Sequence, residues 1–219
     1  MATIQKNDYL IYKNASGKLE RIPVIIENME ITQGKEWGLS VVNPDTKELL
    51  GTVTCWKINN KLKFEGLISH VDGKGVGTKL ILELINISKN LGADGILIAG
   101  ASPSPGSQIK KPLTNIPFYY KLGFQATNSD KHNAIKKLLD EKKDIPLGLN
   151  VFTDIELSKE AAAKLEQKAT ALQQAFEKQN TTNASQTEQF KKATDDLSEK
   201  IVLQTAKTKQ NKQNKDNNR

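Results

Sequence analysis

The chain has one cysteine, few aromatic residues and no long apolar run, and each shortage excludes a class of protein. Because Cys55 stands alone, no internal disulfide can form, which fits a reducing compartment. No apolar stretch approaches the roughly 20 residues that span a bilayer, and residues 1–8 lack the apolar segment of a signal peptide. We therefore expect a cytoplasmic protein with no membrane span, although export without cleavage of the N-terminus stays open.

Apolar residues make up 37% of the 219-residue chain, and most of them precede Ser158. After Ser158 the sequence consists mainly of Ala, Gln, Lys, Asn, Thr and Glu, with apolar residues at helical spacing in two thin stripes. The composition predicts a packed domain over residues 1–157, an amphipathic helical extension over 158–205 and a disordered basic tail over 206–219. The two helical stretches could pair with each other or bind a protein partner, since each would be marginally stable alone.

The C-terminal part is also the most basic part of the chain. Residues 158–219 carry 12 basic and 8 acidic side chains, so four of the seven net positive charges lie there. Such an end could touch nucleic acid or anionic lipid. No aromatic residue stands among its last lysines to stack on bases. We favour a solvated terminus and expect no nucleic-acid partner.

Before Val71, apolar and polar side chains alternate between turn-forming residues, a pattern typical of antiparallel strands. An Asn-Ala-Ser-Gly turn, an Asn-Pro-Asp turn and the pair Asn59–Asn60 separate the strands, and the last is suited to a two-residue hairpin. The pattern predicts strands over residues 9–12, 19–27, 37–42, 49–58 and 62–71.

After Val71 the period changes to that of a helix, which runs from Val76 to Leu91 and ends at Gly92. The next apolar run, over residues 95–99, is typical of a strand that is buried on both faces. Later patterns predict helices over residues 116–122 and 131–143 and a last strand over 149–157. This order predicts an α/β (α+β) fold with a mixed, largely antiparallel sheet and flanking helices.

A glycine-rich segment joins the fifth strand to the long helix. It reads Val-Asp-Gly-Lys-Gly-Val-Gly-Thr over residues 71–78, with glycines at every second position from Gly73 to Gly77. Glycines allow the main chain to turn tightly and approach a ligand, and a helix start adds unpaired N–H groups and a positive dipole end. The segment therefore predicts an anion site suited to a pyrophosphate.

Two common nucleotide-binding motifs fit this segment poorly. A P-loop needs Gly-Lys-Ser/Thr after a four-residue gap, and that order is missing. A dinucleotide fingerprint would place glycine where Thr78 stands and an acidic residue after the next strand, which ends in Gly100-Ala101. A glycine-rich connection without a ligand stays open as the alternative.

Two motifs together resemble the GNAT family of N-acetyltransferases. The stretch from Asp72 to Leu80 resembles that family's coenzyme A loop, Gln/Arg-x-x-Gly-x-Gly/Ala, and residues 118–124, Phe-Tyr-Tyr-Lys-Leu-Gly-Phe, resemble its Phe-Tyr-x-Lys-Leu-Gly-Phe element. The order of elements also matches from Trp37 to Leu157. The chain departs from the family at Asp72, where Gln or Arg is usual, and before Trp37, where strands replace two early helices.

The resemblance implies a GNAT-type fold that binds acetyl-CoA as cosubstrate, without a metal, in a gap between two parting strands. Tyr119 takes the position of the acid that protonates the leaving thiolate, with Tyr120 as the alternative if the register is shifted by one. Glu65 is the candidate base, although a solvated face shared with neighbouring lysines is the alternative. We expect acetyl-CoA to contact Leu67, Ile68, Ser69, Gly73, Lys74, Gly75, Val76, Gly77, Thr78 and Asn115.

The leading hypothesis is an acetyl-CoA-dependent N-acetyltransferase that acts on a primary amine by direct attack, with a protein lysine, a protein N-terminus or a small molecule as acceptor. The alternative is a GNAT-fold module that binds acyl-CoA or a protein partner without turnover. A third hypothesis is an adaptor whose helical extension carries the partner site.

Overall fold

The computed structural model describes residues 3–32, 35–93, 95–101, 116–146, 149, 153–182 and 188. The chain divides into two compact units, Met1–Leu172 and Gln173–Arg219. The sheet and the helices that flank it belong to the first unit, and the described residues 173–182 of the second unit are helical. The three-part division expected from the composition stays a prediction.

Five consecutive antiparallel strands form the N-terminal half of the sheet, which confirms the predicted meander. They are β1 (Thr3–Lys13), β2 (Leu19–Thr32), β3 (Glu36–Val42), β4 (Leu49–Ile58) and β5 (Lys61–Ser69). Asn59 adopts a φ of 52° in the turn between β4 and β5, as the hairpin signal predicted. β1 begins well before Tyr9, because its polar first residues, which carry no apolar alternation, are held by pairing with β2.

The second half of the first unit alternates helices and strands. It comprises α1 (Val76–Asn90), β6 (Leu97–Ala101), α2 (Ile116–Lys121), β7 (Phe124–Ala126), α3 (Ser129–Asp140) and β8 (Thr153–Leu157). The eight strands form one sheet in the order β1-β2-β3-β4-β5-β6-β8-β7. Only the β5–β6 pair is parallel among the described strands, so the sheet is mixed and largely antiparallel, as predicted.

The presence of β7 and the start of β6 also differ from the sequence prediction. β7 was not predicted, because its three residues are too few to show a period. β6 begins at Leu97 rather than at Gly95, because Gly95 has a φ of 75° and belongs to the turn that follows α1. The amide of Ile96 donates to the carbonyl of Ala93 within that turn.

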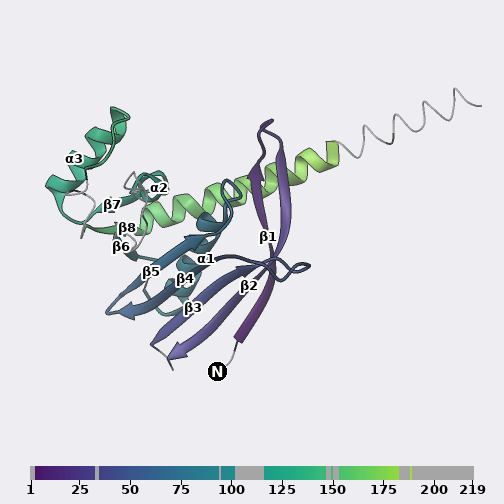
Figure 1. Ribbon diagram of the computed structural model, residues 1–219, viewed down its shortest axis with the longest axis horizontal. Helices are drawn as coiled ribbons and strands as arrows, with labels where there is room; N and C mark the ends of the chain where they lie inside the picture. The colour runs from purple at the N-terminus through teal and green to yellow at the C-terminus, as the bar shows by residue number, and fades with distance from the viewer. Residues whose placement is uncertain are drawn as a thin grey trace, which may run out of the picture. The chain divides into compact units, whose positions relative to one another are not determined.

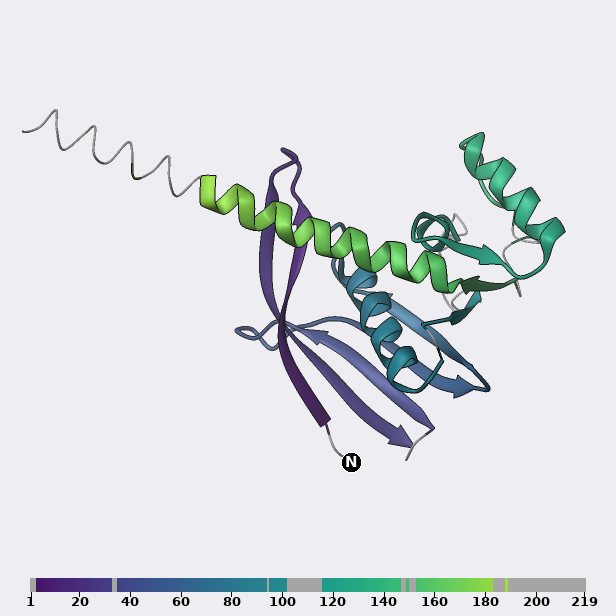
Figure 2. The ribbon, with the colours of Figure 1, turned by 180° about the vertical axis from the view of Figure 1, so that it is seen from behind.

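The core lies between α1 and one face of the sheet (Figures 1 and 2). α1 turns Leu80, Ile81, Leu84 and Ile85 inward, and all four are fully buried. The helical period predicted an apolar stripe of Val76, Leu80, Leu84, Ile87 and Leu91; the first three are buried, and Ile87 and Leu91 are half-buried. A helix over residues 159–182 begins in the first unit, where Ala162 and Leu165 join the same core.

β1 is fixed to α1 by charged side chains. The ammonium of Lys79 lies 2.7 Å from Asp8 and 3.3 Å from Glu83, and Lys6 lies 3.0 Å from Asp8 and 3.4 Å from Glu83. Lys79, Asp8 and Glu83 are each less than one-quarter exposed. The four charges therefore hold the N-terminal strand beside the start of the helix. No helix among the described ranges is long and apolar enough to cross a membrane.

We predict that Leu80→Ala lowers the free energy of unfolding by about 2–5 kcal/mol, because Leu80 is fully buried and its loss leaves a cavity against β4. Leu49→Ala is the matched control, since Leu49 is 41% exposed. Urea unfolding followed by circular dichroism measures both. Equal effects of the two substitutions would contradict the described core.

Candidate functional site

The site begins where β5 and β6 part. The two strands pair only over Leu62–Phe64, while β5 continues to Ser69. On the other side of β5 the register with β4 shifts between Thr54 and Thr52, so two residues of β5, Gly66 and Leu67, face a single residue of β4. Gly66 has a φ of 62°, which glycine adopts without strain. Such a bulge bends its strand, and here it accompanies the separation of β5 from β6.

Beyond Phe64, no described residue pairs with the edge of β5 that faces the gap. The amide of His70 donates to the carbonyl of Leu50, 2.9 Å away, and Ile68 lies opposite Thr52 in the same register. The main-chain groups of these two positions therefore point toward β4. Because successive residues of a strand alternate in direction, those of Leu67 and Ser69 point toward the edge that β6 has left.

The turn after β5 has the main-chain geometry of an anion-binding nest. Gly73 and Gly75 have φ values of 68° and 80°, and Lys74 between them does not have a positive φ. Alternation of this kind turns successive N–H groups toward a common concave side. Gly75 is also the N-cap of α1 and offers no side-chain acceptor.

The first turn of α1 adds further donors. The amide of Lys79 donates to the carbonyl of Gly75, 2.9 Å away, and is the first helical bond. The amides of Val76, Gly77 and Thr78 precede that bond and have no acceptor within the helix. The first turn also carries no acidic residue, so the positive end of the helix dipole is not neutralised from within.

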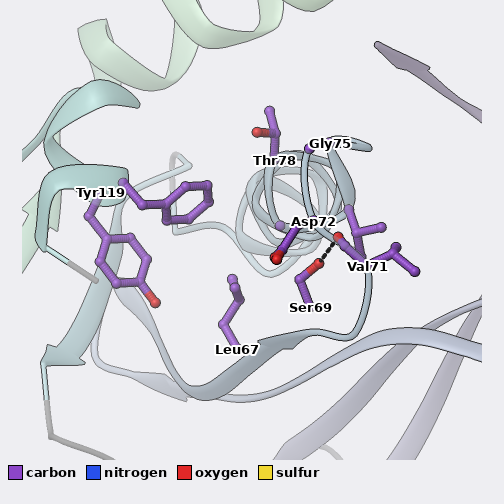
Figure 3. Close-up of a pocket in the computed structure, with 11 residues that line it drawn as sticks. Leu67, Ser69, Val71, Asp72, Gly75, Thr78 and Tyr119 are labelled. Atoms are coloured by element: carbon purple, nitrogen blue, oxygen red, sulfur yellow. Dashed lines mark hydrogen bonds between the residues drawn. The ribbon is translucent and has the colours of Figure 1, made fainter. Parts of the chain in front are cut away.

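A cavity of about 450 Å³ lies between the end of β5, the glycine turn, the start of α1 and the helix α2 (Figure 3). Eight of the residues proposed from the sequence line it: Leu67, Ser69, Gly73, Gly75, Val76, Gly77, Thr78 and Tyr119. Segments almost fifty residues apart in the sequence thus meet at one cavity, as the pair of motifs predicted.

Three proposed residues do not line this cavity. The side chain of Ile68 is 49% exposed and that of Glu65 is exposed on β5. Lys74 turns its ammonium away from the cavity to the hydroxyl of Tyr12, 2.9 Å away. Asn115 lies outside the residues that the structure describes, so its contact stays a prediction.

Val71, Asp72 and Phe118 also line the cavity, although they were not among the expected contacts of acetyl-CoA. Phe118 is half-buried beside the helix start. A Cβ built on Gly77 would lie 3.0 Å from its ring, so glycine at position 77 lets the ring of Phe118 approach the helix. Asp72 is the only charged side chain among the described lining residues.

Tyr119 places a phenol at the cavity. Its side chain is 6% exposed and packs against Phe64, Phe118 and Phe124, with ring centroids 5.2–6.0 Å apart. Figure 3 shows its hydroxyl on the cavity side, facing Leu67. Burial raises the pKa of Tyr119 to about 12, so the phenol holds its proton throughout the neutral range.

Tyr120, the alternative acid, faces another part of the fold. Its hydroxyl accepts a hydrogen bond from the amide of Ala126 at 3.1 Å and lies 3.2 Å from Nδ1 of His132. The rings of Tyr120 and His132 are stacked. Tyr120 therefore holds α2, β7 and α3 together, and Tyr119 is the tyrosine at the cavity.

The remaining reactive side chains do not gather around the cavity. Cys55 is fully buried, and this burial raises the pKa of its thiol to about 12, so it is a packed side chain. His70 is exposed at the end of β5. Within the described ranges, no group of three or more His, Cys, Asp or Glu side chains could hold a metal ion.

Comparisons with known proteins gave likenesses in structure only. No family model matches the sequence, and no curated protein matches it. One similar solved structure is the PaiA N-acetyltransferase from Thermoplasma acidophilum in complex with coenzyme A, at 19% identity and a TM-score of 0.37. The match covers 56% of this chain and 60% of that one. Nourseothricin acetyltransferase matches at 15% identity and a TM-score of 0.37, covering 70% of this chain and 84% of its own. At these TM-scores we draw no inference from either likeness.

We predict that one tyrosine of the folded protein ionises near pH 12 and that Tyr119→Phe removes this step. Because the fold favours the neutral phenol, the stability that this preference contributes is present below pH 10 and is lost as the pH rises through 12. Tyrosinate absorbance measures the titration, with the protein in denaturant as control, where tyrosines ionise near pH 10 (about the free value). If Tyr119→Phe instead removed a step near pH 10 from the titration of the folded protein, the buried position of Tyr119 would be contradicted.

Proposed function

We propose that this chain is an acetyl-CoA-dependent N-acetyltransferase of the GNAT type. The observation that carries the proposal is the meeting of three features at one cavity. These are the glycine turn at the start of α1, the edge of β5 beyond Phe64, with which no described residue pairs, and the phenol of Tyr119. The first suits a diphosphate, the second an extended chain of amides, and the third a leaving group that needs a proton.

The described residues offer groups that suit the chemistry of acetyl-CoA. The amides of Val76, Gly77 and Thr78 would hold the diphosphate, and main-chain groups of Leu67 and Ser69 would pair with the amides of pantetheine as a neighbouring strand would. The apolar side chains of Leu67 and Phe118 would border the thioester end. Asp72 opposes an anion, but its side chain is exposed, where water and salt screen its charge.

Tyr119 is proposed to protonate the sulfur as the acetyl group is transferred. The amine nitrogen forms a bond to the acetyl carbon, the bond from that carbon to sulfur breaks, and sulfur takes the phenolic proton. A pKa of about 12 does not prevent this step. A thiolate that forms at the same cavity would be desolvated as well, which raises its own pKa and favours its protonation.

Glu65 stays the proposed base. Its side chain is exposed on β5 and faces Thr54 across the β4–β5 register. From there it could take the proton of an incoming ammonium through water rather than by direct contact. The acceptor is proposed to be a primary amine on a protein or a small molecule, and the protein is proposed to act in the cytoplasm.

A second candidate is a non-catalytic GNAT-fold module that binds acyl-CoA or a protein through its helical extension. The observation that favours it is the charge at the cavity, where Asp72 is present and Lys74 is engaged elsewhere. Binding and turnover are therefore measured separately below.

We predict that acetyl-CoA binds the purified chain and that Gly75→Ala weakens its Kd by about tenfold or more, because a side chain at a φ of 80° costs about 1–2 kcal/mol and shifts the turn. Isothermal calorimetry measures the affinity. Gly92→Ala is the matched control, since Gly92 has a φ of 69° at the other end of α1 and lies outside the cavity lining. Absence of acetyl-CoA binding, or equal loss in the two variants, would refute the site.

We also predict that the chain releases free CoA thiol from acetyl-CoA with at least one member of a primary-amine panel. Tyr119→Phe should lower kcat by about a hundredfold or more, because a general acid is lost, and should leave the Kd of acetyl-CoA unchanged. Tyr120→Phe, which removes a hydroxyl bonded to Ala126, should retain activity. Binding without thiol release across the panel would favour the non-catalytic module.

A further inference from the structure

Lys74 lies at the centre of the glycine turn but directs its side chain away from the cavity. Its ammonium is 2.9 Å from the hydroxyl oxygen of Tyr12 and 4.1 Å from the centroid of the Tyr12 ring. Lys74 thus donates a hydrogen bond to the hydroxyl of Tyr12 and also makes a cation–π contact with its ring. Tyr12 belongs to β1 and is 8% exposed, so this contact is partly shielded from water.

A chain of hydrogen bonds continues from Tyr12 along the end of the β1–β2 hairpin. An ammonium can only donate, so the Tyr12 oxygen accepts from Lys74, and its own proton goes to Glu20 at 2.5 Å. The amide of Asn14 donates to the other oxygen of Glu20 at 2.7 Å. These two donors are the main reason why the pKa of Glu20 lies below its ordinary value. Glu20 therefore stays ionised and balances the charge of Lys74.

The main chain of the turn lies against the same strand. A Cβ on Gly75 would have the carbonyl oxygen of Ile11 as its nearest neighbour, at 3.8 Å. Two residues with positive φ flank Lys74, and glycines allow a chain many alternative conformations. The side chain of Lys74 is thus the one tether, among the described residues of the turn, that restricts this freedom from the hairpin side.

We propose that Lys74 is a positioning residue for acetyl-CoA, and that the β1–β2 hairpin holds the anion-binding turn in its competent shape through Lys74 and Tyr12. This inference rests on the proposed function. It replaces the sequence-based expectation that Lys74 contacts acetyl-CoA directly. The hairpin thereby belongs to the donor site although Tyr12 and Glu20 do not line the cavity.

The expected effect on the Kd of acetyl-CoA follows from the fraction of molecules in which the turn has the conformation that binds the ligand. When that fraction falls, the apparent Kd rises by the same factor. Loss of a cation–π contact and a charged hydrogen bond should weaken acetyl-CoA binding about three- to tenfold. A positioning role leaves two quantities unchanged: the salt dependence of binding, because no phosphate contact is lost, and kcat.

The test compares Lys74→Met, Lys74→Arg, Tyr12→Leu and the double variant Lys74→Met/Tyr12→Leu in the full chain, with acetyl-CoA as the probe. Calorimetry at several salt concentrations gives Kd. We expect Lys74→Met and Tyr12→Leu each to weaken acetyl-CoA binding about three- to tenfold, with an unchanged salt dependence of Kd. The double variant should be no weaker than either single one, because both remove the same tether. Lys74→Arg should restore binding, since arginine also donates and packs on aromatic rings.

Tyr9→Leu is the matched control. Tyr9 lies on the same strand and has the guanidinium of Arg21 4.2 Å from its ring centroid, but it is not among the residues that line the cavity. Acetyl-CoA affinity should be unchanged in this variant. Thermal unfolding of each variant shows whether the fold is retained.

Two results would overturn the inference. If Tyr12→Leu tightens binding, the hairpin withholds Lys74 from the phosphates. If Lys74→Met flattens the salt dependence while Tyr12→Leu has no effect, Lys74 is itself a phosphate ligand. Amide hydrogen exchange over residues 73–77 without any ligand separates this inference from the proposed function. Faster exchange in Lys74→Met supports the tether even if acetyl-CoA fails to bind the wild type, and unchanged exchange refutes it.

Discussion

The short parallel pairing of β5 with β6 is the constraint on which the rest of the site depends. Three residue pairs hold the two strands together, and beyond Phe64 this edge of β5 has no partner in the part of the chain that the structure describes. A longer pairing would saturate the main-chain groups of Leu67 and Ser69 and would close the cavity. The bulge at Gly66 and Leu67 keeps β5 bonded to β4 while it bends, so the sheet remains continuous on one side of the gap and opens on the other. The start of α1 then lies where the two strands have separated.

The described residues that line the cavity offer hydrogen-bond donors but no cationic side chain. Its donors are main-chain amides fixed by the helix and by two glycines with positive φ, and such groups are oriented before any ligand arrives. Lys74, the cation of the turn, is bound to Tyr12 and balanced by Glu20. An anion would therefore be held by directed dipoles rather than by an ion pair. Binding by directed dipoles depends on the conformation of the turn. The β1–β2 hairpin, which contacts the turn through Tyr12, therefore matters for anion binding although it does not line the cavity.

The sequence predicted most of the elements because their signals are local. β4 has the predicted bounds, and α1 ends within one residue of its predicted end, since apolar periodicity and flanking turns define both. The glycine turn and Tyr119, which two motifs of the sequence singled out, line one cavity. The directions of the Lys74 and Phe118 side chains could not be predicted, because they depend on contacts distant in sequence. Nothing near Lys74 indicates that Tyr12 lies above it, and nothing near Phe118 indicates that glycine at position 77 leaves room for its ring.

The two adjacent tyrosines show how packing assigns roles that a motif leaves open. Tyr119 and Tyr120 have similar chemistry and neighbouring positions on a short helix, but successive helical side chains point about 100° apart. The rings of Phe64 and Phe124 hold Tyr119 from the sheet side and leave its hydroxyl at the cavity. Tyr120 instead bonds to Ala126 and stacks on His132. The register of α2 is thus set by aromatic packing on β5 and β7, and that packing decides which phenol can reach a ligand in the gap between the strands.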